Sequence, residues 1–242
     1  MEDQAPRDAL AAHLIPCLPP SCYYIPTFLT LDEESLVLCH LYALPPTRWT
    51  QLSRRRLLSF PSPLTGSGRD TLLSAPLPSF LSSPFIPRFS TLGLFQQSPH
   101  RSPNHCLVNE YRPGEGIMPH EDGPAYYPCT ATVSLGSHSV LDVYEKNAAG
   151  EREREPRWRI LQERGSLLVT LGGMYSVTLH GISEREIDER LDEDNIVNWS
   201  LLGDKSAFTE GRRGRESRIS LTFRDVKKVV NFGGAVKFLQ KK

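Results

Sequence analysis

Three separated motifs carry side chains that could bind a metal ion and an anion in one cavity. The first, NEYRPGEGIMPHED (109–122), contains His120 and Asp122. Residues two apart on an extended backbone point to the same side, so both side chains can reach one metal ion. A lone His-x-Asp occurs by chance in many chains, and the alternative interpretation is a polar loop that bears one histidine.

The second motif, SVTLH (176–180), places His180 at the end of an alternating run that indicates a strand. Thr178 and His180 would share one face of this strand, and His180 would complete the metal site. A single histidine at a strand end is more often satisfied by a backbone carbonyl than by a metal ion. This motif therefore indicates a metal ligand only when it is considered together with the other two motifs.

The third motif, RISLTFR (218–224), has the period-2 alternation of a strand with one polar and one apolar face. The polar face holds Arg218, Ser220, Thr222 and Arg224. If the apolar face packs on the core, both arginines point into a cavity; otherwise the segment is an ordinary amphipathic edge strand. Buried arginine is rare unless it is paired, so an arginine-lined interior predicts an anionic ligand.

Together the motifs supply two imidazoles, one carboxylate and two arginines. Two histidines and one carboxylate with open coordination positions are typical of non-haem Fe(II) oxygenases. A dicarboxylic acid that reached from the metal ion to an arginine would satisfy the anion-binding face. The sequence therefore predicts oxidative chemistry at a ferrous ion.

The region that must position these residues has the pattern of a β-sandwich or barrel. Turn signals of Gly, Pro and Asn at short intervals separate six runs that predict strands. These runs are residues 106–111, 131–135, 140–145, 166–171, 175–182 and 217–226. Two charged inserts interrupt them: residues 146–157 predict an exposed hairpin, and residues 183–195 could form a helix.

The N-terminal part of the chain is less regular. Residues 1–22 are interpreted as a flexible leader, because the acidic start and Pro16 do not fit a signal peptide. Residues 23–28 predict an edge strand. Thr30 and Glu33 form a capping-box pattern that predicts the start of a helix. The apolar stripe expected on that helix consists of Leu31, Val37, Leu38, Leu41 and Tyr42.

Residues 23–103 as a whole are expected to form a helical extension and a substrate lid ahead of the β region at 104–242. Within it, residues 61–103 hold eight of the twenty prolines. A helix broken at Pro84 and Pro87 is expected around residues 77–94, and the tip of this stretch is expected to be disordered.

The composition of the chain argues against several classes of protein. The 242 residues include 28 Lys plus Arg and 28 Asp plus Glu, so nucleic-acid binding would have to come from a local patch. No run of 18 apolar residues exists, which predicts no membrane span. The five cysteines lack CxxC pairs, which argues against a disulfide framework or a structural zinc site and fits the cytoplasm and nucleus.

Taken in order, N-x-Y-x-P-G-E-x-I-x-x-H-x-D, a distal histidine and R-x-S-x-T-x-R resemble the AlkB family of Fe(II)/2-oxoglutarate dioxygenases. GIMPHEDGPAYYP (116–128) and TVSLGSHSVLDVYE (132–145) are most similar to the sixth human-type AlkB homologue subgroup. The resemblance covers residues 104–226 strongly and residues 23–60 loosely. It implies an all-β core with flanking helices (α+β), built as a double-stranded β-helix or jelly-roll barrel.

The resemblance also implies roles for individual residues and for three cofactors: Fe(II), 2-oxoglutarate and O2. His120, Asp122 and His180 would bind Fe(II), which 2-oxoglutarate would chelate. Arg218 would pair with the distal carboxylate of 2-oxoglutarate. Further contacts would come from Tyr111 and Ser220 at that end, and from Asn109 and Arg224 at the other. Position 220 is Ser where the founding bacterial member has Asn, a difference that other members share.

The substrate is expected to be an N-alkylated nucleic acid, which would lose the alkyl group as an aldehyde while 2-oxoglutarate yields succinate and CO2. Five residues of the hairpin-like segment 48–60 would contact it: Trp49, Arg54, Arg55, Arg56 and Phe60. Alternatively, Trp49 packs on the core and the arginines form a solvated turn. A protein or lipid substrate, a nucleic-acid-binding module without turnover and a cupin-like metal protein also stay open. A monomer is expected.

Overall fold

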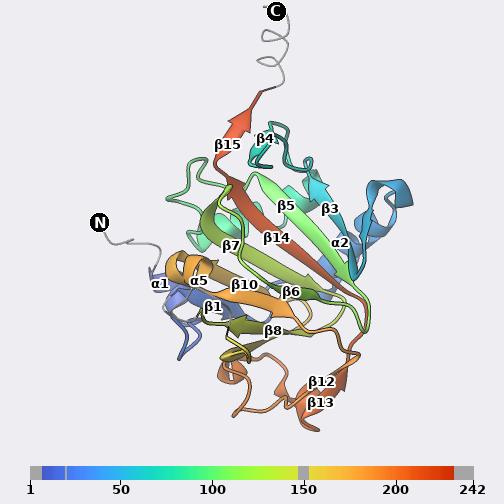
Figure 1. The fold of residues 1–242 in the computed structure, drawn as a ribbon, viewed down its shortest axis with the longest axis vertical. Helices are drawn as coiled ribbons and strands as arrows, with labels where there is room; N and C mark the ends of the chain where they lie inside the picture. Colours follow the sequence, from blue (N-terminus) through green and yellow to red (C-terminus); the bar gives the residue numbers. More distant parts are fainter. Residues whose placement is uncertain (1–6, 20, 147–152, 232–242) are drawn as a thin grey trace, which may run out of the picture.

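Two antiparallel sheets of the computed structural model face each other and hold the three motifs between them (Figure 1). The structure describes residues 7–19, 21–146 and 153–231. The larger sheet runs, in spatial order, β1 (Cys22–Ile25), β10 (Leu167–Leu171), β7 (Tyr126–Leu135), β14 (Arg218–Val226), β5 (His105–Tyr111), β3 (Arg55–Phe60) and β2 (Thr50–Leu52). The smaller runs β6 (Ile117–His120), β11 (Leu179–Ile182), β8 (Ser139–Tyr144) and β9 (Trp158–Gln162). The expected jelly roll is confirmed.

Shorter elements surround these sheets. Two strand pairs stand apart: β12 (Ile187–Glu189) with β13 (Arg212–Gly214), and β4 (Thr71–Leu73) with β15 (Lys228–Val230). The helices are α1 (Arg7–Ala11), α2 (Leu31–Tyr42), α3 (Ser79–Ser82), α4 (Ile86–Thr91) and α5 (Gly172–Val177), with 3-10 turns η1 (Pro46–Arg48), η2 (Trp199–Leu201) and η3 (Lys205–Phe208). No helix in the described ranges is long and apolar enough to cross a membrane.

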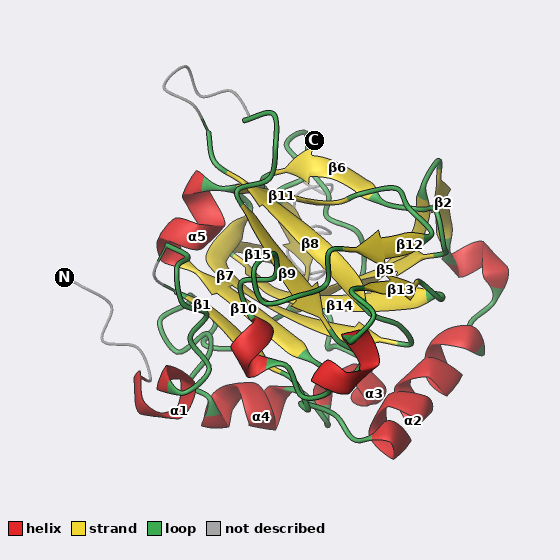
Figure 2. Ribbon diagram, turned by 90° about the horizontal axis from the view of Figure 1, so that it is seen from below, coloured by secondary structure: helices red, strands yellow, loops and turns green. Residues whose placement is uncertain are grey.

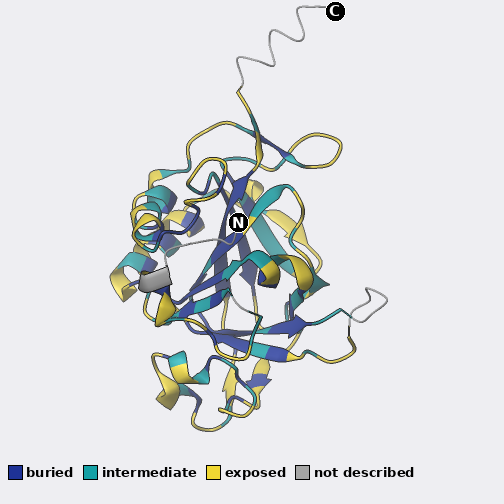
Figure 3. Cartoon of the chain, turned by 90° about the vertical axis from the view of Figure 1, so that its left-hand side faces the viewer, coloured by how far each residue is buried: buried dark blue, intermediate teal, exposed yellow. Residues whose placement is uncertain are grey.

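Helices α2, α3 and α4 cover the outer face of the larger sheet (Figure 2). Apolar residues at alternate positions of the strands, such as Val108, Val133 and Leu221, pack there in one cluster with Phe85 and Phe89 of the helical segment. Because side chains alternate along a strand, the other face of the sheet turns toward the smaller sheet; it carries the polar residues of β14 and, on β1 and β10, apolar residues that pack with β8 and β9 in a second cluster. Figure 3 shows the central strands as the most buried part of the chain.

The helix α2 begins as the sequence predicts. Thr30 Oγ1 accepts from the Glu33 amide, and the Glu33 carboxylate accepts from the Thr30 amide, which completes the capping box. Of the expected stripe, Val37 and Leu41 are buried and Leu38 is partly buried against the core. The expectation is wrong for the two ends of the stripe, Leu31 and Tyr42, which are 66% and 50% exposed.

The N-terminal segments are part of the same sheet as the β region. β1 pairs with β10, and β3 pairs with β5. Within the expected flexible leader, the side chains of Leu10 and Ile15 are buried at 2% and 1% exposure and pack in the core, whereas residues 9, 11, 12, 14, 16 and 17 are exposed. Residues 1–6 and 20 lie outside the described ranges. Within 61–103, β4 pairs with β15; the expected disorder at the tip of this stretch stays a prediction.

Most predicted strands are confirmed, and the differences have local causes. Residues 175–177 belong to α5 and not to a strand, because Gly172, with φ +48°, redirects the chain before the alternation begins. β6 was missed since it contains Pro119, which a strand tolerates only at an edge, and β6 is the edge of its sheet. The break expected at Pro87 is absent: proline stands in the first turn of α4.

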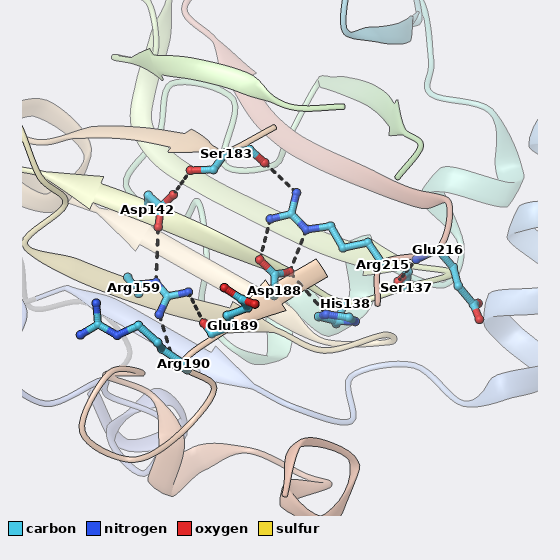
Figure 4. A network of polar contacts seen from close by, with 10 residues as sticks. All are labelled: Ser137, His138, Asp142, Arg159, Ser183, Asp188, Glu189, Arg190, Arg215 and Glu216. Atoms are coloured by element: carbon cyan, nitrogen blue, oxygen red, sulfur yellow. Dashed lines mark hydrogen bonds and ion pairs between the residues drawn. The ribbon is translucent and has the colours of Figure 1, made fainter. Parts of the chain in front are cut away.

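The acidic segment 183–195 contains β12 and turns, so the expectation of a helix is wrong there. Its central carboxylate, Asp188, is fully buried. Arg215 donates to both oxygens of Asp188 at 2.7 Å, and His138 Nε2 lies 3.4 Å away (Figure 4). A tertiary ion pair thus overrides the local helical preference. Of the other insert, the described residues follow β8 and precede β9, and residues 147–152 lie outside the described ranges.

The same network extends to the strand that carries His180. Arg215 Nη1 donates to the Ser183 carbonyl at 2.8 Å, and Ser183 Oγ donates to Asp142 at 2.5 Å (Figure 4). Asp142 also lies 3.6 Å from Arg159, which donates to the backbone carbonyl oxygens of Glu189 and Arg190. These hydrogen bonds and ion pairs connect the insert 183–195 to β8, to β9 and to the end of β11.

Replacement of Asp188 by Asn is expected to reduce the free energy of unfolding at pH 7 by about 2–4 kcal/mol, because Arg215 would stay buried without its counter-charge. Burial raises the pKa of Asp188, but hydrogen bonds and charges of His138 and Arg215 outweigh it and lower the pKa to about 2. The ionised carboxylate therefore stabilises the fold above its unfolded pKa, and this contribution of roughly 2 kcal/mol is lost as pH falls from about 5 to 2.

Urea unfolding from pH 7 to pH 3 would measure both effects. The difference between wild type and Asp188→Asn should shrink as pH falls. Asp194→Asn, at an exposed position of the same segment, should follow wild type throughout. A constant offset between wild type and Asp188→Asn at every pH would contradict the assigned pKa.

Candidate active site

Three candidate metal ligands converge in the cavity between the two sheets. The ligand atoms of His120, Asp122 and His180 all lie within 4.8 Å of one another. His120 ends β6, His180 lies in β11, and the two residues are direct partners in the antiparallel pairing of these strands. Their ring centroids are 4.6 Å apart. Strand register therefore places the two imidazoles side by side, although they are far apart in the sequence.

The close approach of β6 and β11 depends on two glycines. A Cβ on Gly116 would lie 2.2 Å from the carbonyl oxygen of Ile182, and a Cβ on Gly181 would lie 2.9 Å from that of Ile117. Any side chain at either position would force the strands apart. Since Gly181 directly follows His180, this constraint acts on a candidate ligand itself.

The surroundings of both imidazoles favour binding of a metal ion. His120 Nδ1 lies 2.9 Å from the Met118 carbonyl oxygen. Because a carbonyl oxygen only accepts, Nδ1 is the donor of this hydrogen bond, and Nε2 is the ring nitrogen that is left to bind a metal ion. Burial lowers the pKa of His180 to about 4; Asp122 opposes this shift, whereas His120 and Arg224 add to it. His180 is therefore neutral near pH 7.

The third ligand, Asp122, is held by Arg224, whose Nη2 donates to Oδ1. Both side chains are 8% exposed. The guanidinium carbon of Arg224 lies 4.7 Å from the ring centroid of Tyr126. Burial alone would lower the pKa of Arg224, but Asp122 and nearby tyrosines raise it overall. Arg224 thus orients the carboxylate, as groups behind a metal ligand commonly do.

At the other end of β14, Arg218 is a buried cation with unused donors. Its Nη2 donates to Ser134 Oγ at 2.8 Å and to Gln162 Oε1 at 3.1 Å. Within the described part of the chain, Nε and Nη1 have no hydrogen-bond partner. Burial lowers the pKa of Arg218 to about 10, so the group is still charged at pH 7. A buried, partly unsatisfied guanidinium is a site for a carboxylate.

The candidate metal ligands and both arginines line one cavity of about 420 Å³. The three candidate ligands lie in its wall with the five residues that the resemblance implied for the co-substrate: Asn109, Tyr111, Arg218, Ser220 and Arg224. The alternation of β14 is as predicted, since Ile219, Leu221 and Phe223 pack in the core on the other face. Two basic groups at opposite ends of one strand, with a metal site beside one of them, can hold a dicarboxylic acid that chelates a metal ion.

Of the residues expected to contact a substrate, only Arg55 lines the cavity, where its Nε donates to Asn109 Oδ1 at 3.1 Å. Arg56 follows on the opposite face of β3, pairs with Glu110, and lies 4.2 Å from the ring centroid of Trp49. Arg54 pairs with the exposed Glu184 at 3.3 Å.

Phe60 requires a correction. It shares the outer face of β3 with Leu58, is 4% exposed, and packs edge-on against Phe80 under the helices. Because side chains alternate along β3, Arg55 faces the cavity, whereas Arg56 and Phe60, which were also expected to contact the substrate, face away from it.

Other residues of the cavity wall were not expected from the sequence. They include Leu64, Gly68, Arg69 and Asp70, which precede β4, and Tyr126, Gln162 and Tyr175. Tyr175 donates to the Gly123 carbonyl at 3.1 Å, and burial raises its pKa. The glycines at 66 and 68 were a signal for a tight loop. Nothing in the sequence indicated that this loop reaches the cavity.

Comparison with known proteins agrees with this geometry. Residues 74–224 match the 2OG-Fe(II) oxygenase superfamily. The chain is 38% identical over 227 residues to a Danio rerio protein named "Probable RNA/DNA demethylase ALKBH6", covering 91% of this chain and 92% of that protein. The chain belongs to the 2OG-Fe(II) oxygenase superfamily and is an AlkB-like oxidoreductase.

Two further similarities are more distant. A Macaca fascicularis protein named "tRNA (carboxymethyluridine(34)-5-O)-methyltransferase ALKBH8" is 25% identical over 224 residues, which cover 87% of this chain but 31% of that longer protein. A solved structure named "The structure of OsALKBH1" has a TM-score of 0.53 at 17% identity, covering 86% of this chain and 98% of the other. The latter supports the fold.

Replacement of Arg218 by Met is expected to raise the Kd for 2-oxoglutarate about 30-fold or more, because a buried charge pair would lose one partner. Arg218→Lys should recover only part of this loss, since a lysine cannot bind a carboxylate in a bidentate manner. Anaerobic titration of the Fe(II)-loaded protein, followed by the visible charge-transfer band, would measure these affinities.

The matched ligand is 2-oxobutyrate, which keeps the keto acid and lacks the distal carboxylate. Wild type should bind 2-oxoglutarate much more tightly than 2-oxobutyrate, and Arg218→Met should bind the two about equally. A preference for 2-oxoglutarate that survives in the variant would show that another residue binds the distal carboxylate.

Proposed function

We propose that this chain is an Fe(II)- and 2-oxoglutarate-dependent dioxygenase that removes N-alkyl groups from nucleic acid. The observation that carries the proposal is the arrangement of one cavity. Two imidazoles and a carboxylate meet in it, and a buried arginine with two unused donors faces the same space. This donor set fits Fe(II), and the arginine fits the distal carboxylate of 2-oxoglutarate.

In this proposal His120, Asp122 and His180 hold the iron, which with 2-oxoglutarate and O2 supplies oxygen insertion into a C–H bond, with succinate and CO2 as co-products. Asp122 is kept in position by Arg224, and the Met118 carbonyl fixes the tautomer of His120. Arg218 fixes the co-substrate at the far end, supported by Ser134 and Gln162. An N-methyl group hydroxylated in this way would release formaldehyde.

Two observations favour nucleic acid as the substrate class. The Danio rerio relative is named as an RNA/DNA demethylase. The cavity also presents Tyr126 and Tyr175 beside the candidate metal ligands, and aromatic side chains are what an extruded base requires. A methylated protein side chain is the alternative, and the experiment below separates the two.

A panel of N-methylated single-stranded RNA and DNA oligonucleotides should release formaldehyde with Fe(II) and 2-oxoglutarate, while methylated peptides should not. His120→Ala and Asp122→Ala should lower turnover roughly a hundredfold or more, because each removes a metal ligand. Mass spectrometry of the product and succinate detection provide the measurements. His40→Ala, at an exposed histidine outside the cavity, should behave as wild type.

Demethylation of peptides alone would refute the nucleic-acid substrate but leave the chemistry intact. Succinate formation that persists in both ligand variants would instead refute the proposed metal site.

A further inference from the structure

Gln162 is a buried polar side chain that connects the two sheets at one end of the cavity. It lies in β9 of the smaller sheet, is 1% exposed, and lines the cavity. Its Oε1 accepts from Arg218 Nη2 of the larger sheet at 3.1 Å, and Ser134 Oγ of β7 accepts from the same nitrogen at 2.8 Å. The position of the Arg218 guanidinium is therefore set from both sheets.

Strand register fixes how far Gln162 lies from the candidate metal ligand His180. β8 runs between β11 and β9, with Val143 opposite His180 and Ser139 opposite Gln162. Four residues of a strand span about 13 Å. Leu141 stands between them on the same face and lines the cavity with Val143. A ligand that extends from the metal site toward Gln162 thus passes an apolar surface whose length the backbone determines.

Ser134 and Gln162 also orient the free donors of Arg218. A terminal guanidinium nitrogen carries two protons, and these two acceptors take both protons of Nη2. Among the residues that the structure describes, none accepts from Nε or Nη1. Arg218 also borders a second cavity of about 10 Å³, which holds about one water molecule. A longer ligand therefore finds little further space on that side.

We propose that Gln162 selects the chain length of the keto diacid that this enzyme uses. Gln162 closes the cavity where the second carboxylate binds and holds Arg218 at a fixed distance from the metal site. The inference rests on the 2-oxoglutarate part of the proposed function and makes it specific. A diacid with one more methylene group would meet the Gln162 side chain. Because the amide is neutral, it orients the guanidinium without compensating the charge that binds the ligand.

Replacement of Gln162 by Ala is expected to relax the preference for length. Wild type should bind 2-oxoglutarate at least about tenfold more tightly than 2-oxoadipate, which has one more methylene group. In Gln162→Ala the end of the cavity is opened, so this ratio should fall to about threefold or less. Anaerobic titration of the Fe(II)-loaded protein with each keto acid, followed by the charge-transfer band, would measure the ratio.

Two matched variants separate space from hydrogen bonding. Ser134→Ala removes the other acceptor of Arg218 Nη2 without opening the end of the cavity, so it should weaken both diacids and keep their ratio. Gln162→Met keeps a side chain of similar length and should also keep the ratio.

Gln162→Glu tests the requirement for a neutral side chain with almost no change of shape. The new carboxylate would pair with Arg218 and compete with the ligand, so the Kd for 2-oxoglutarate should rise about 30-fold or more. The Kd for 2-oxobutyrate, which lacks the second carboxylate, should stay nearly unchanged. Thermal unfolding followed by circular dichroism would show that each variant is folded.

A length ratio that is the same in wild type and Gln162→Ala would overturn the inference and leave the proposed function intact. The same holds for a Gln162→Glu protein that binds 2-oxoglutarate as tightly as wild type does. If wild type gave no charge-transfer band with any of the three keto acids, the proposed function would fail and the inference with it.

Discussion

The buried strand β14 is the constraint on which the rest of the structure depends. All nine of its residues are buried, and two of its inward-facing side chains are arginines. Removing a guanidinium from water is costly by several kcal/mol unless an acceptor is provided. Asp122 provides one for Arg224, whereas Ser134 and Gln162 satisfy Arg218 only in part. Arg218 therefore keeps buried donors that an anion could satisfy, and it lines the same cavity as the candidate metal ligands.

Burial on both faces makes this arrangement rigid. The outer face of β14 packs under α4 through Phe223, which contacts Phe85 and Phe89 at centroid distances of 5.0 and 5.1 Å. Strands β5 and β7 pair with both edges of β14. Since nothing along the strand is free to shift, both arginines keep fixed positions relative to the metal site, which suits a co-substrate held at both ends.

The residues that line the cavity on paired strands could be predicted from the sequence better than the inserts and the outer segments of the fold, for a physical reason. The spacing of His120 and Asp122 and the alternation of β14 are local patterns that backbone geometry converts directly into a common face. The insert around Asp188 could not be predicted, because its structure depends on Arg215 and His138 from other segments. Phe60 and Arg56 were misassigned since aromatic and basic residue types alone do not reveal which face of β3 meets the cavity.

The residues expected to bind the metal ion and co-substrate follow local sequence patterns, whereas the residues at the outer wall of the cavity come together only through contacts between distant segments. Groups that would bind the metal ion and co-substrate lie mainly on paired strands, where register fixes them. The outer wall is made by residues 64–70 before β4, by the segment before β7 and by α5, which are distant in sequence and meet only in the fold. Loops on a rigid barrel can vary without disturbing the strands beneath. Arg69 stands on such a loop, and β15, which follows β14, pairs with the strand after this loop. The outer wall can therefore change while β14 does not.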